Sequence, residues 1–266
     1  MSTTVTLYQI DAFTQSVFGG NPAAICPLNA WLPEPVMQAM ATENNLSETA
    51  FFVIRDDGHY HIRWFTPAAE IDLAGHPTLA AAWLILERLA PGRDQVVFHT
   101  QRGDTLTVTR MDGGMLSMDF PSRPPAPWTP NRDLEPIIGQ PPLEVQANDR
   151  DVLVRLPDAA AVRAVTVDQN ALLGVDRELL LVTAPGDDCD FVSRVFAPKH
   201  GVPEDPVTGS AHCTLIPFWA GRLGKDEMLA RQVSARGGEL RVGLAGNRVR
   251  IAGHAVLYMV GEVLLP

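Results

Sequence analysis

The chain has 266 residues, of which 46% are hydrophobic and 20% are charged. This length allows one large domain or two of ordinary size, and the composition is typical of a globular protein. The formal net charge of −10 argues against nucleic-acid binding, which needs a basic surface. The N-terminus shows no signal-peptide pattern, and no apolar run reaches the roughly 18 residues of a membrane span. The cysteines Cys26, Cys189 and Cys213 lack metal-binding spacing and suggest reduced thiols, so we expect a cytoplasmic protein.

The first half of the sequence predicts a strand-rich lobe. Gly19, Gly20, Asn21 and Pro22 predict a turn, and a proline in the first turn supports a short helix over residues 35–42. Alternating or continuous apolar runs predict strands at residues 5–13, 49–54, 60–65, 95–100, 105–110 and 115–120.

A proline-rich segment follows this lobe. Five prolines within residues 121–130 predict a stiff, extended linker. We therefore expect an N-terminal lobe at residues 1–120, which the last strand at about 256–266 could join, and a C-terminal lobe at residues 131–266. The second lobe has short predicted helices between residues 158 and 173. Its predicted strands lie at residues 144–147, 152–156, 179–183, 191–196, 232–235, 240–243, 248–251 and 255–265.

Two segments predict unusually apolar helices. Residues 78–86 are apolar on every face, which predicts a helix buried on all sides. Residues 211–219 are also largely apolar, and Pro217 should kink or shorten that helix. A curved, mostly antiparallel sheet wrapped around each helix would bury both, which predicts an α+β fold.

The two halves contain an internal repeat. Phe65 and Phe196 are 131 residues apart, and Gly75 and Gly209 are 134 apart, so the second copy has three extra residues. Similarity at half the chain length predicts two similar lobes, and the crevice between lobes is the expected ligand site.

The glycines at the starts of the two helices suggest an anion site. A helix N-terminus exposes unpaired N–H groups and a partial positive charge, which bind carboxylates or phosphates, and glycine allows close approach. The simpler interpretation is that Gly75 and Gly209 only begin buried helices. Two matched copies favour the anion site.

Glu48 is a candidate base. It lies where a polar run enters the apolar strand beginning at Ala50, and desolvation there would raise a carboxyl pKa toward the range useful for proton transfer. On the residues alone, a solvated loop glutamate is the simpler interpretation.

The ordered motifs resemble one known family. The set closely resembles the phenazine-biosynthesis PhzF-like isomerase family, and its motifs are Gly20-Asn21-Pro22, Asn45-Leu46-Ser47-Glu48, Phe65-Thr66-Pro67, Gly75-His76-Pro77 and Asp205-Pro206-Val207-Thr208-Gly209-Ser210. The resemblance implies a diaminopimelate-epimerase-like fold with the active site between the lobes. It also implies cofactor-free proton transfer at carbon of a small carboxylate-bearing substrate, and a homodimer.

The resemblance assigns roles by position. It implies that Glu48 moves the proton and that His76 and Asp205 complete the catalytic group. The implied substrate-binding residues are Asn21, Gly75, Thr208, Gly209 and Ser210.

Each of these residues also has a plain structural interpretation. His76 could be held by local backbone, Asp205 and Asn21 fit turns before proline, and Ser210 could cap its helix. Asp205 could instead orient Glu48 or share its proton.

Two other kinds of site are disfavoured. Related amino-acid epimerases use two cysteines, and the nearest positions here hold Ala74 and Pro206. His59 and His61 would share one strand face, but no third ligand is indicated, so we predict no metal site and no cofactor.

The leading hypothesis is an isomerase that moves a proton on a small carboxylate-bearing metabolite. The alternatives are an amino-acid or imino-acid racemase or epimerase and, from another class, a non-catalytic small-anion-binding protein. Glu48 favours an enzyme, because anion binding gains nothing from a nearby carboxylate.

Overall fold

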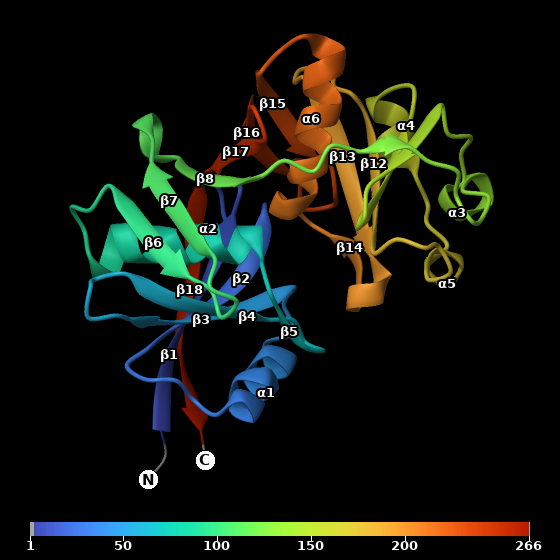
Figure 1. The fold of residues 1–266 in the computed structure, drawn as a ribbon. Helices are drawn as coiled ribbons and strands as arrows, with labels where there is room; N and C mark the ends of the chain where they lie inside the picture. Colours follow the sequence, from blue (N-terminus) through green and yellow to red (C-terminus); the bar gives the residue numbers. More distant parts are fainter. Residues whose placement is uncertain (1–2, 266) are drawn as a thin grey trace. The chain divides into compact units, whose positions relative to one another are not determined.

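The computed structural model of the protein describes residues 3–265 (Figure 1). Contacts along the chain divide it into two compact units. The first unit consists of Met1–Asp119 and Ala252–Pro266, and the second consists of Phe120–Ile251. The C-terminal segment therefore packs with the first unit, and the proline-rich segment belongs to the second.

The first unit is built from strands and two main helices. The helices are α1 (Glu34–Asn44) and α2 (Gly75–Leu84), which a π-helical turn (Ile85–Leu89) extends. A 3-10 turn (Asp112–Gly114) precedes the eighth strand. The strands are β1 (Thr3–Ala12), β2 (Asn21–Leu28), β3 (Glu48–Ile54), β4 (Tyr60–Phe65), β5 (Glu70–Ile71), β6 (Gln95–His99), β7 (Thr105–Arg110), β8 (Leu116–Pro121) and β18 (Ala255–Leu265).

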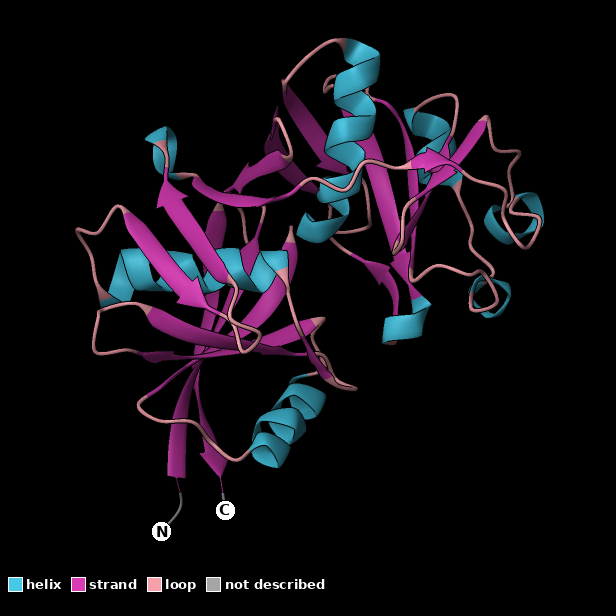
Figure 2. Ribbon diagram, viewed as in Figure 1, coloured by secondary structure: helices cyan, strands magenta, loops and turns pink. Residues whose placement is uncertain are grey.

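Most strands of the first unit pair antiparallel around α2. β18, β1 and β2 pair antiparallel, β3 runs parallel to β2, and β4 runs antiparallel to β3. One end of β4 pairs with β5 and the other runs parallel to β6, from which β7 and β8 continue. α2 contacts β1, β2, β3 and β18, and nine of its ten residues are buried (Figure 2). The prediction of a helix buried on every side is confirmed.

The second unit has the same kinds of element. Its helices are α3 (Glu135–Ile138), α4 (Ala159–Ala164), α5 (Gln169–Leu172) and α6 (His212–Leu223), with 3-10 turns at Pro198–His200 and Gly209–Ala211. Its strands are β9 (Ala126–Pro127), β10 (Glu144–Ala147), β11 (Asp151–Arg155), β12 (Leu179–Pro185), β13 (Phe191–Ala197), β14 (Val202–Asp205), β15 (Glu227–Gln232), β16 (Gly238–Ala245) and β17 (Arg248–Gly253).

The strand pairing of the second unit repeats that of the first. β10 to β16 pair in the same order and with the same directions as β1 to β7, including the parallel pairs β11–β12 and β13–β15. The predicted internal repeat and the α+β fold class are therefore confirmed.

A partly buried arginine and a glutamate are repeated as well. Arg63 on β4 donates to both oxygens of Glu70 at 2.7 and 2.6 Å, and its guanidinium lies over the Phe65 ring. In the second unit Arg194 donates to both oxygens of Glu204 at 2.7 and 2.8 Å and lies over Phe196. The pair joins β4 to β5 in one unit and β13 to β14 in the other.

In each unit this arginine also holds a helix. Arg63 donates to Glu34 in the first turn of α1 at 2.8 Å. Arg194 donates to the carbonyls at the end of α4, at Val162, Arg163 and Val165. The three extra residues of the second copy lie between its Phe196 and Glu204, where the chain forms the 3-10 turn Pro198–His200.

The strand predictions need two corrections. No strand was predicted at β2, where Asn21 and Pro22 were assigned to a turn, yet β2 pairs on both sides, with β1 and β3. The short strands β5, β9 and β14 were not predicted either. The strand predicted at residues 232–235 lies instead at Glu227–Gln232, where apolar and polar residues alternate weakly. The remaining predicted strands are found within a few residues of their expected ends.

Pro217 does not shorten α6, which continues to Leu223. Proline at position 217 leaves the carbonyl of Cys213 without its usual helical donor. The backbone N–H of Arg123 supplies a donor at 2.9 Å. Because the freed carbonyl is bonded, the helix tolerates the proline.

The proline-rich segment that was expected to be a linker is extended and takes part in the second unit. β9 pairs with β10 through Gln146 and Ala147. Within residues 3–265, no helix is both long and apolar enough to cross a membrane.

Candidate active site

The start of β2 places Asn21 in the interior of the first unit. Asn21 lies opposite Ala12 on β1 and is fully buried. Gly20 before it has a φ of 62°, and a Cβ there would lie 2.1 Å from the Ala12 carbonyl oxygen. Only glycine fits this turn, which explains the Gly20-Asn21-Pro22 motif.

The start of β3 positions Glu48. Asn45 ends α1 in the left-handed conformation, with a φ of 48°, and its N–H bonds to the Ala41 carbonyl. The Asn45-Leu46-Ser47-Glu48 motif thus runs from a helix C-cap to the first residue of a strand. Glu48 lies beside Ala23 in the parallel pair, and its side chain is 16% exposed.

The start of α2 positions His76. α2 begins at Gly75, as predicted, and among the described residues no side chain caps its N-terminus. Its backbone N–H groups therefore remain suited to an anion. Thr78 donates its hydroxyl to the Ala74 carbonyl at 2.5 Å, inside the first turn.

Asn21, Glu48 and His76 meet at the start of α2. His76 Nε2 lies 3.3 Å from Glu48 Oε2, and His76 Nδ1 lies 3.1 Å from Asn21 Nδ2. Burial lowers the pKa of His76 to about 3, so the imidazole is neutral at neutral pH. The contact with Glu48 is therefore not a pair of full charges.

The second unit contains the other predicted site residues in one loop. Thr208 donates its hydroxyl to Asp205 Oδ2 at 2.5 Å. Gln232 accepts from the Thr208 N–H at 2.8 Å and donates to the Asp205 carbonyl at 2.6 Å. Gln232 is fully buried and fixes this loop, a role that the sequence did not predict.

Gly209 opens a 3-10 turn and not α6 itself, which begins three residues later at His212. His212 Nδ1 lies 2.9 Å from the Thr208 carbonyl, as Thr78 bonds to Ala74 in the first unit. Ala74 is therefore equivalent to Thr208. Sequence motifs had instead given Ala74 and Pro206 as the positions nearest to the two cysteines of the epimerases. Burial lowers the pKa of His212 to about 4.

A buried ion pair holds the Gly209–Ala211 turn. Arg150 donates to both oxygens of Asp151 at 2.7 and 2.9 Å and to the Ser210 carbonyl at 3.0 Å. Asp151 is fully buried and also accepts from the Thr214 hydroxyl at 2.5 Å. The turn after Gly209 is thereby tied to the start of β11.

The cysteines do not occupy the catalytic positions. Cys26 and Cys213 are buried, and burial raises their thiol pKa values to about 12 and about 11. Thiols that stay protonated are poor acids and bases at neutral pH. Ala74 and Thr208 stand before the two glycines.

The chain is similar to known proteins over nearly its whole length. An uncharacterized isomerase of Pseudomonas aeruginosa is 48% identical over 261 residues, covering 98% of this chain and 99% of that one. The crystal structure of a PhzF-family phenazine biosynthesis protein from Enterococcus faecalis superposes with a TM-score of 0.92 at 43% identity, covering 99% of this chain and all of the other.

More distant structures share the fold alone. A hydroxyproline epimerase from Agrobacterium vitis gives a TM-score of 0.63 at 10% identity and covers 98% of this chain and 93% of its own. The family model for phenazine biosynthesis-like proteins, PhzC-PhzF, matches residues 10–261. The chain therefore belongs to the phenazine biosynthesis-like (PhzC-PhzF) protein family.

Proposed function

We propose that the protein is a cofactor-independent isomerase that transfers a proton at carbon of a small carboxylate-bearing metabolite. The observation that carries this proposal is the Glu48 carboxylate beside a buried, neutral His76 at the uncapped start of α2. The isomerase named among its relatives supports the class of reaction.

The contacts of His76 support a role for it in the proposal. An amide Nδ2 only donates, so we propose that His76 Nδ1 accepts from Asn21 and that the neutral ring carries its proton on Nε2. That proton faces Glu48 Oε2. His76 is then a neutral donor that orients the carboxylate, and Glu48 carries the proton.

The proposed reaction needs one base. The substrate carboxylate binds the N–H groups at the start of α2, and Glu48 removes a proton from a nearby carbon. We propose a substrate with a double bond next to that carbon, so the electron pair left there delocalises to the second carbon, and the helix N-terminus stabilises the charge. Glu48 then delivers a proton to a second carbon, and because its carboxyl can exchange that proton with water, solvent deuterium can enter the product. One proton is removed and one is added, so substrate and product have the same composition in ordinary water.

The second copy of the repeat is part of the proposal. Asp205, Thr208, Gly209 and Ser210 are proposed as further site residues, which the repeat of the loop-to-helix motif supports. Homodimer formation and a cytoplasmic location remain predictions from the resemblance and the composition.

The repeat favours isomerisation over racemisation. Thr49 pairs with Phe65 as Leu180 pairs with Phe196, which places Leu179 at the position of Glu48. A racemase needs an acid and a base on opposite faces of one carbon. The second copy offers leucine at this position, so one carboxylate moving one proton fits better.

Proton exchange in deuterated water tests the proposal. Candidate carboxylates are incubated with the wild-type protein and with Glu48→Gln, and NMR locates deuterium at carbon. In the wild type we expect deuterium at a carbon other than the one that loses its proton, with the carbon skeleton unchanged. We expect no incorporation with Glu48→Gln. Equal incorporation by both proteins would overturn the role of Glu48, and inverted configuration at a single carbon would indicate an epimerase. Binding without exchange would indicate an anion-binding protein.

A further inference from the structure

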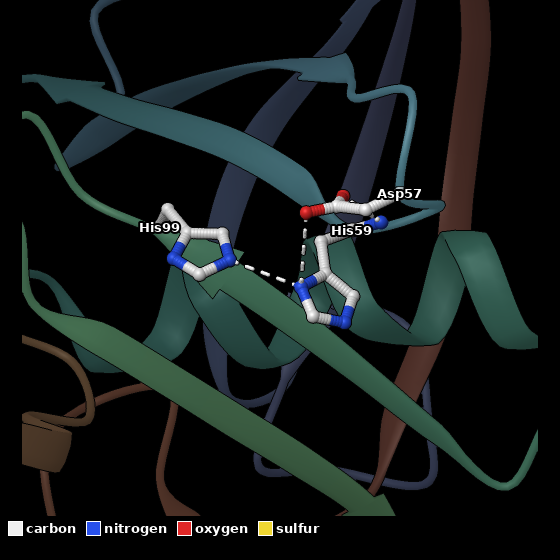
Figure 3. Close-up of side chains that lie close together, drawn as sticks. All are labelled: Asp57, His59 and His99. Carbon is white, nitrogen blue, oxygen red and sulfur yellow. Dashed lines mark hydrogen bonds and ion pairs between the residues drawn. The ribbon is translucent and has the colours of Figure 1, made fainter.

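Three potential metal ligands come together in the first unit, on elements that the proposed reaction does not use. Asp57 and His59 lie in the turn between β3 and β4, and His99 is the last residue of β6, which runs parallel to β4 (Figure 3). The sequence pointed only to His59 and His61, without a third ligand. In the structure His61 turns toward Arg55, with 3.1 Å between Nε2 and Nη1, and His99 takes its place beside His59.

The spacing of the ligand atoms suits one ion. His59 Nδ1 lies 3.0 Å from His99 Nε2 and 3.7 Å from Asp57 Oδ2. Tetrahedral coordination at roughly 2.0–2.1 Å places ligand atoms about 3.3 Å apart. The two observed distances bracket that separation, so small side-chain rotations would bring all three atoms to one centre.

Neighbouring groups orient the ligands. The His59 backbone N–H donates to Asp57 Oδ1 at 3.0 Å, which leaves Oδ2 as the oxygen nearer the ring. His99 Nδ1 lies 3.2 Å from the Thr105 hydroxyl. If Nδ1 carries the hydrogen and donates to Thr105, the lone pair on Nε2 points at His59. Such outer hydrogen bonds are what fix metal-binding histidines.

The surrounding charge selects the kind of ion. Arg55 contacts the Asp57 carboxylate, with Nη2 3.1 Å from Oδ2, and therefore competes for that oxygen. Hard ions such as Mg²⁺ and Ca²⁺ depend on carboxylates, whereas Zn²⁺ and its neighbours bind well to imidazole. An ion held mainly by the His59 and His99 imidazoles loses least affinity from the competition of Arg55 for the Asp57 carboxylate.

We propose that Asp57, His59 and His99 form a binding site for a divalent transition-metal ion of the Zn²⁺ class, with water as the fourth ligand. The side chains of Asp57 and His59 are 45% and 42% exposed, so the ion can enter from solvent. It would tie the β3–β4 turn to the end of β6. The site is separate from Glu48 and His76, and the proposal stands independently of the isomerase assignment.

Direct metal binding is the test. Zn²⁺ is titrated calorimetrically into the full chain carrying Cys189→Ser, because Cys189 is the cysteine that is not buried. We expect one equivalent to bind, and His59→Ala and His99→Ala each to weaken binding by at least about 10-fold. Co²⁺ in place of Zn²⁺ should give the visible absorption of a tetrahedral site.

His200→Ala is the matched control. His200 Nε2 lies 3.4 Å from Glu178 in the second unit, which makes it a comparable exposed histidine beside a carboxylate, and its loss should leave Zn²⁺ affinity unchanged. Zn²⁺ should raise the melting temperature of the control by at least about 2 °C but not that of the His59→Ala, His99→Ala double variant. Equal Zn²⁺ affinity in the control and the double variant, or less than one equivalent bound by the control, would overturn the site.

Discussion

The first and second units share a scaffold but differ where the chemistry is expected. Both repeat the order of strand pairing, and both fasten a helix to a hairpin through one arginine. At the start of the parallel strand, however, the first unit has Glu48 and the second has Leu179. The repeated pattern therefore indicates what the fold needs, and Glu48 is an unmatched position to which our proposal gives a role in the reaction.

The start of the neighbouring strand shows the same contrast. Ala23 lies beside Glu48, and the equivalent Asp151 lies beside Leu179. In the second unit Asp151 forms an ion pair with Arg150, and Arg150 also donates to the Ser210 carbonyl in the Gly209–Ala211 turn. In the first unit the polar side chains are instead Glu48 at the start of β3 and His76 in α2. At these positions the second unit has a structural ion pair, and the first has the residue that we propose as the base.

The largest expected effect comes from Glu48. Glu48→Gln keeps the shape but cannot accept a proton, so we expect turnover to fall by at least ~100-fold with little change in KM. Leu179→Met at the equivalent position should leave turnover within about twofold. Single-turnover assays with the substrate found by deuterium exchange check both.

His76→Ala and Asp205→Ala should lose less activity than Glu48→Gln, because they orient groups and do not carry the proton. A Glu48→Gln enzyme with near-normal turnover would remove Glu48 from the mechanism and break the contrast between the units.

The next effect concerns the repeated arginines. Arg194→Ala leaves Glu204 and the carbonyls at the end of α4 without their donor, so we expect about 3 kcal/mol of lost stability. Arg63→Ala should cost less, about 2 kcal/mol, because its other partner, Glu34, is exposed. Urea unfolding of both variants measures the difference. A larger loss for Arg63→Ala would show that the two pairs are not equivalent.

The sequence predicted much of this scaffold, because the repeat and the apolar helices depend on local patterns. It did not reveal that Arg63–Glu70 and Arg194–Glu204 are equivalent pairs, since the three extra residues between Phe196 and Glu204 shift the glutamate relative to the arginine. β2 was missed because Asn21 and Pro22 were assigned to a turn, and only pairing on both sides makes a strand there.

The site was predicted in part. Motif resemblance identified Asn21, Glu48 and His76, which the structure brings into contact. Gln232 and Asp151 act through long-range hydrogen bonds, and no local pattern marks them. Likewise, His99 comes beside His59 through the parallel pairing of β4 and β6, which the spacing of histidines in the sequence does not show.

The buried histidines predict a pH effect on stability. His76 and His212 have pKa values of about 3 and about 4 in the folded protein, below the ordinary value of 6.5. Unfolding lets both bind protons, so their contribution is present above about pH 6.5 and is lost as the pH falls from there toward the folded values. Each adds a slope of up to about 1.4 kcal/mol per pH unit.

His212→Thr isolates one of the two contributions. Threonine is the residue at the equivalent position, Thr78, and can keep the bond to the Thr208 carbonyl. Between pH 6.5 and 5, the free energy of unfolding should fall by about 1.5 kcal/mol less in the variant than in the wild type. Identical falls in urea titrations at the two pH values would show that His212 is not held neutral.

The smallest effect tests the difference between the two central helices. By the offset of the glycines, Trp83 in α2 corresponds to Pro217 in α6, and only the second helix lacks an N–H at this position. A proline inside a helix ordinarily costs about 3 kcal/mol, partly through the unbonded carbonyl four residues earlier. Here the Arg123 N–H bonds to that carbonyl, at Cys213.

Pro217→Ala also gives the unfolded chain more freedom, which lowers stability by roughly 0.4–1 kcal/mol. We therefore expect the free energy of unfolding to change by less than about 1 kcal/mol in urea titrations. A gain near 3 kcal/mol would show that the strand-like segment at Arg123 does not compensate for the proline.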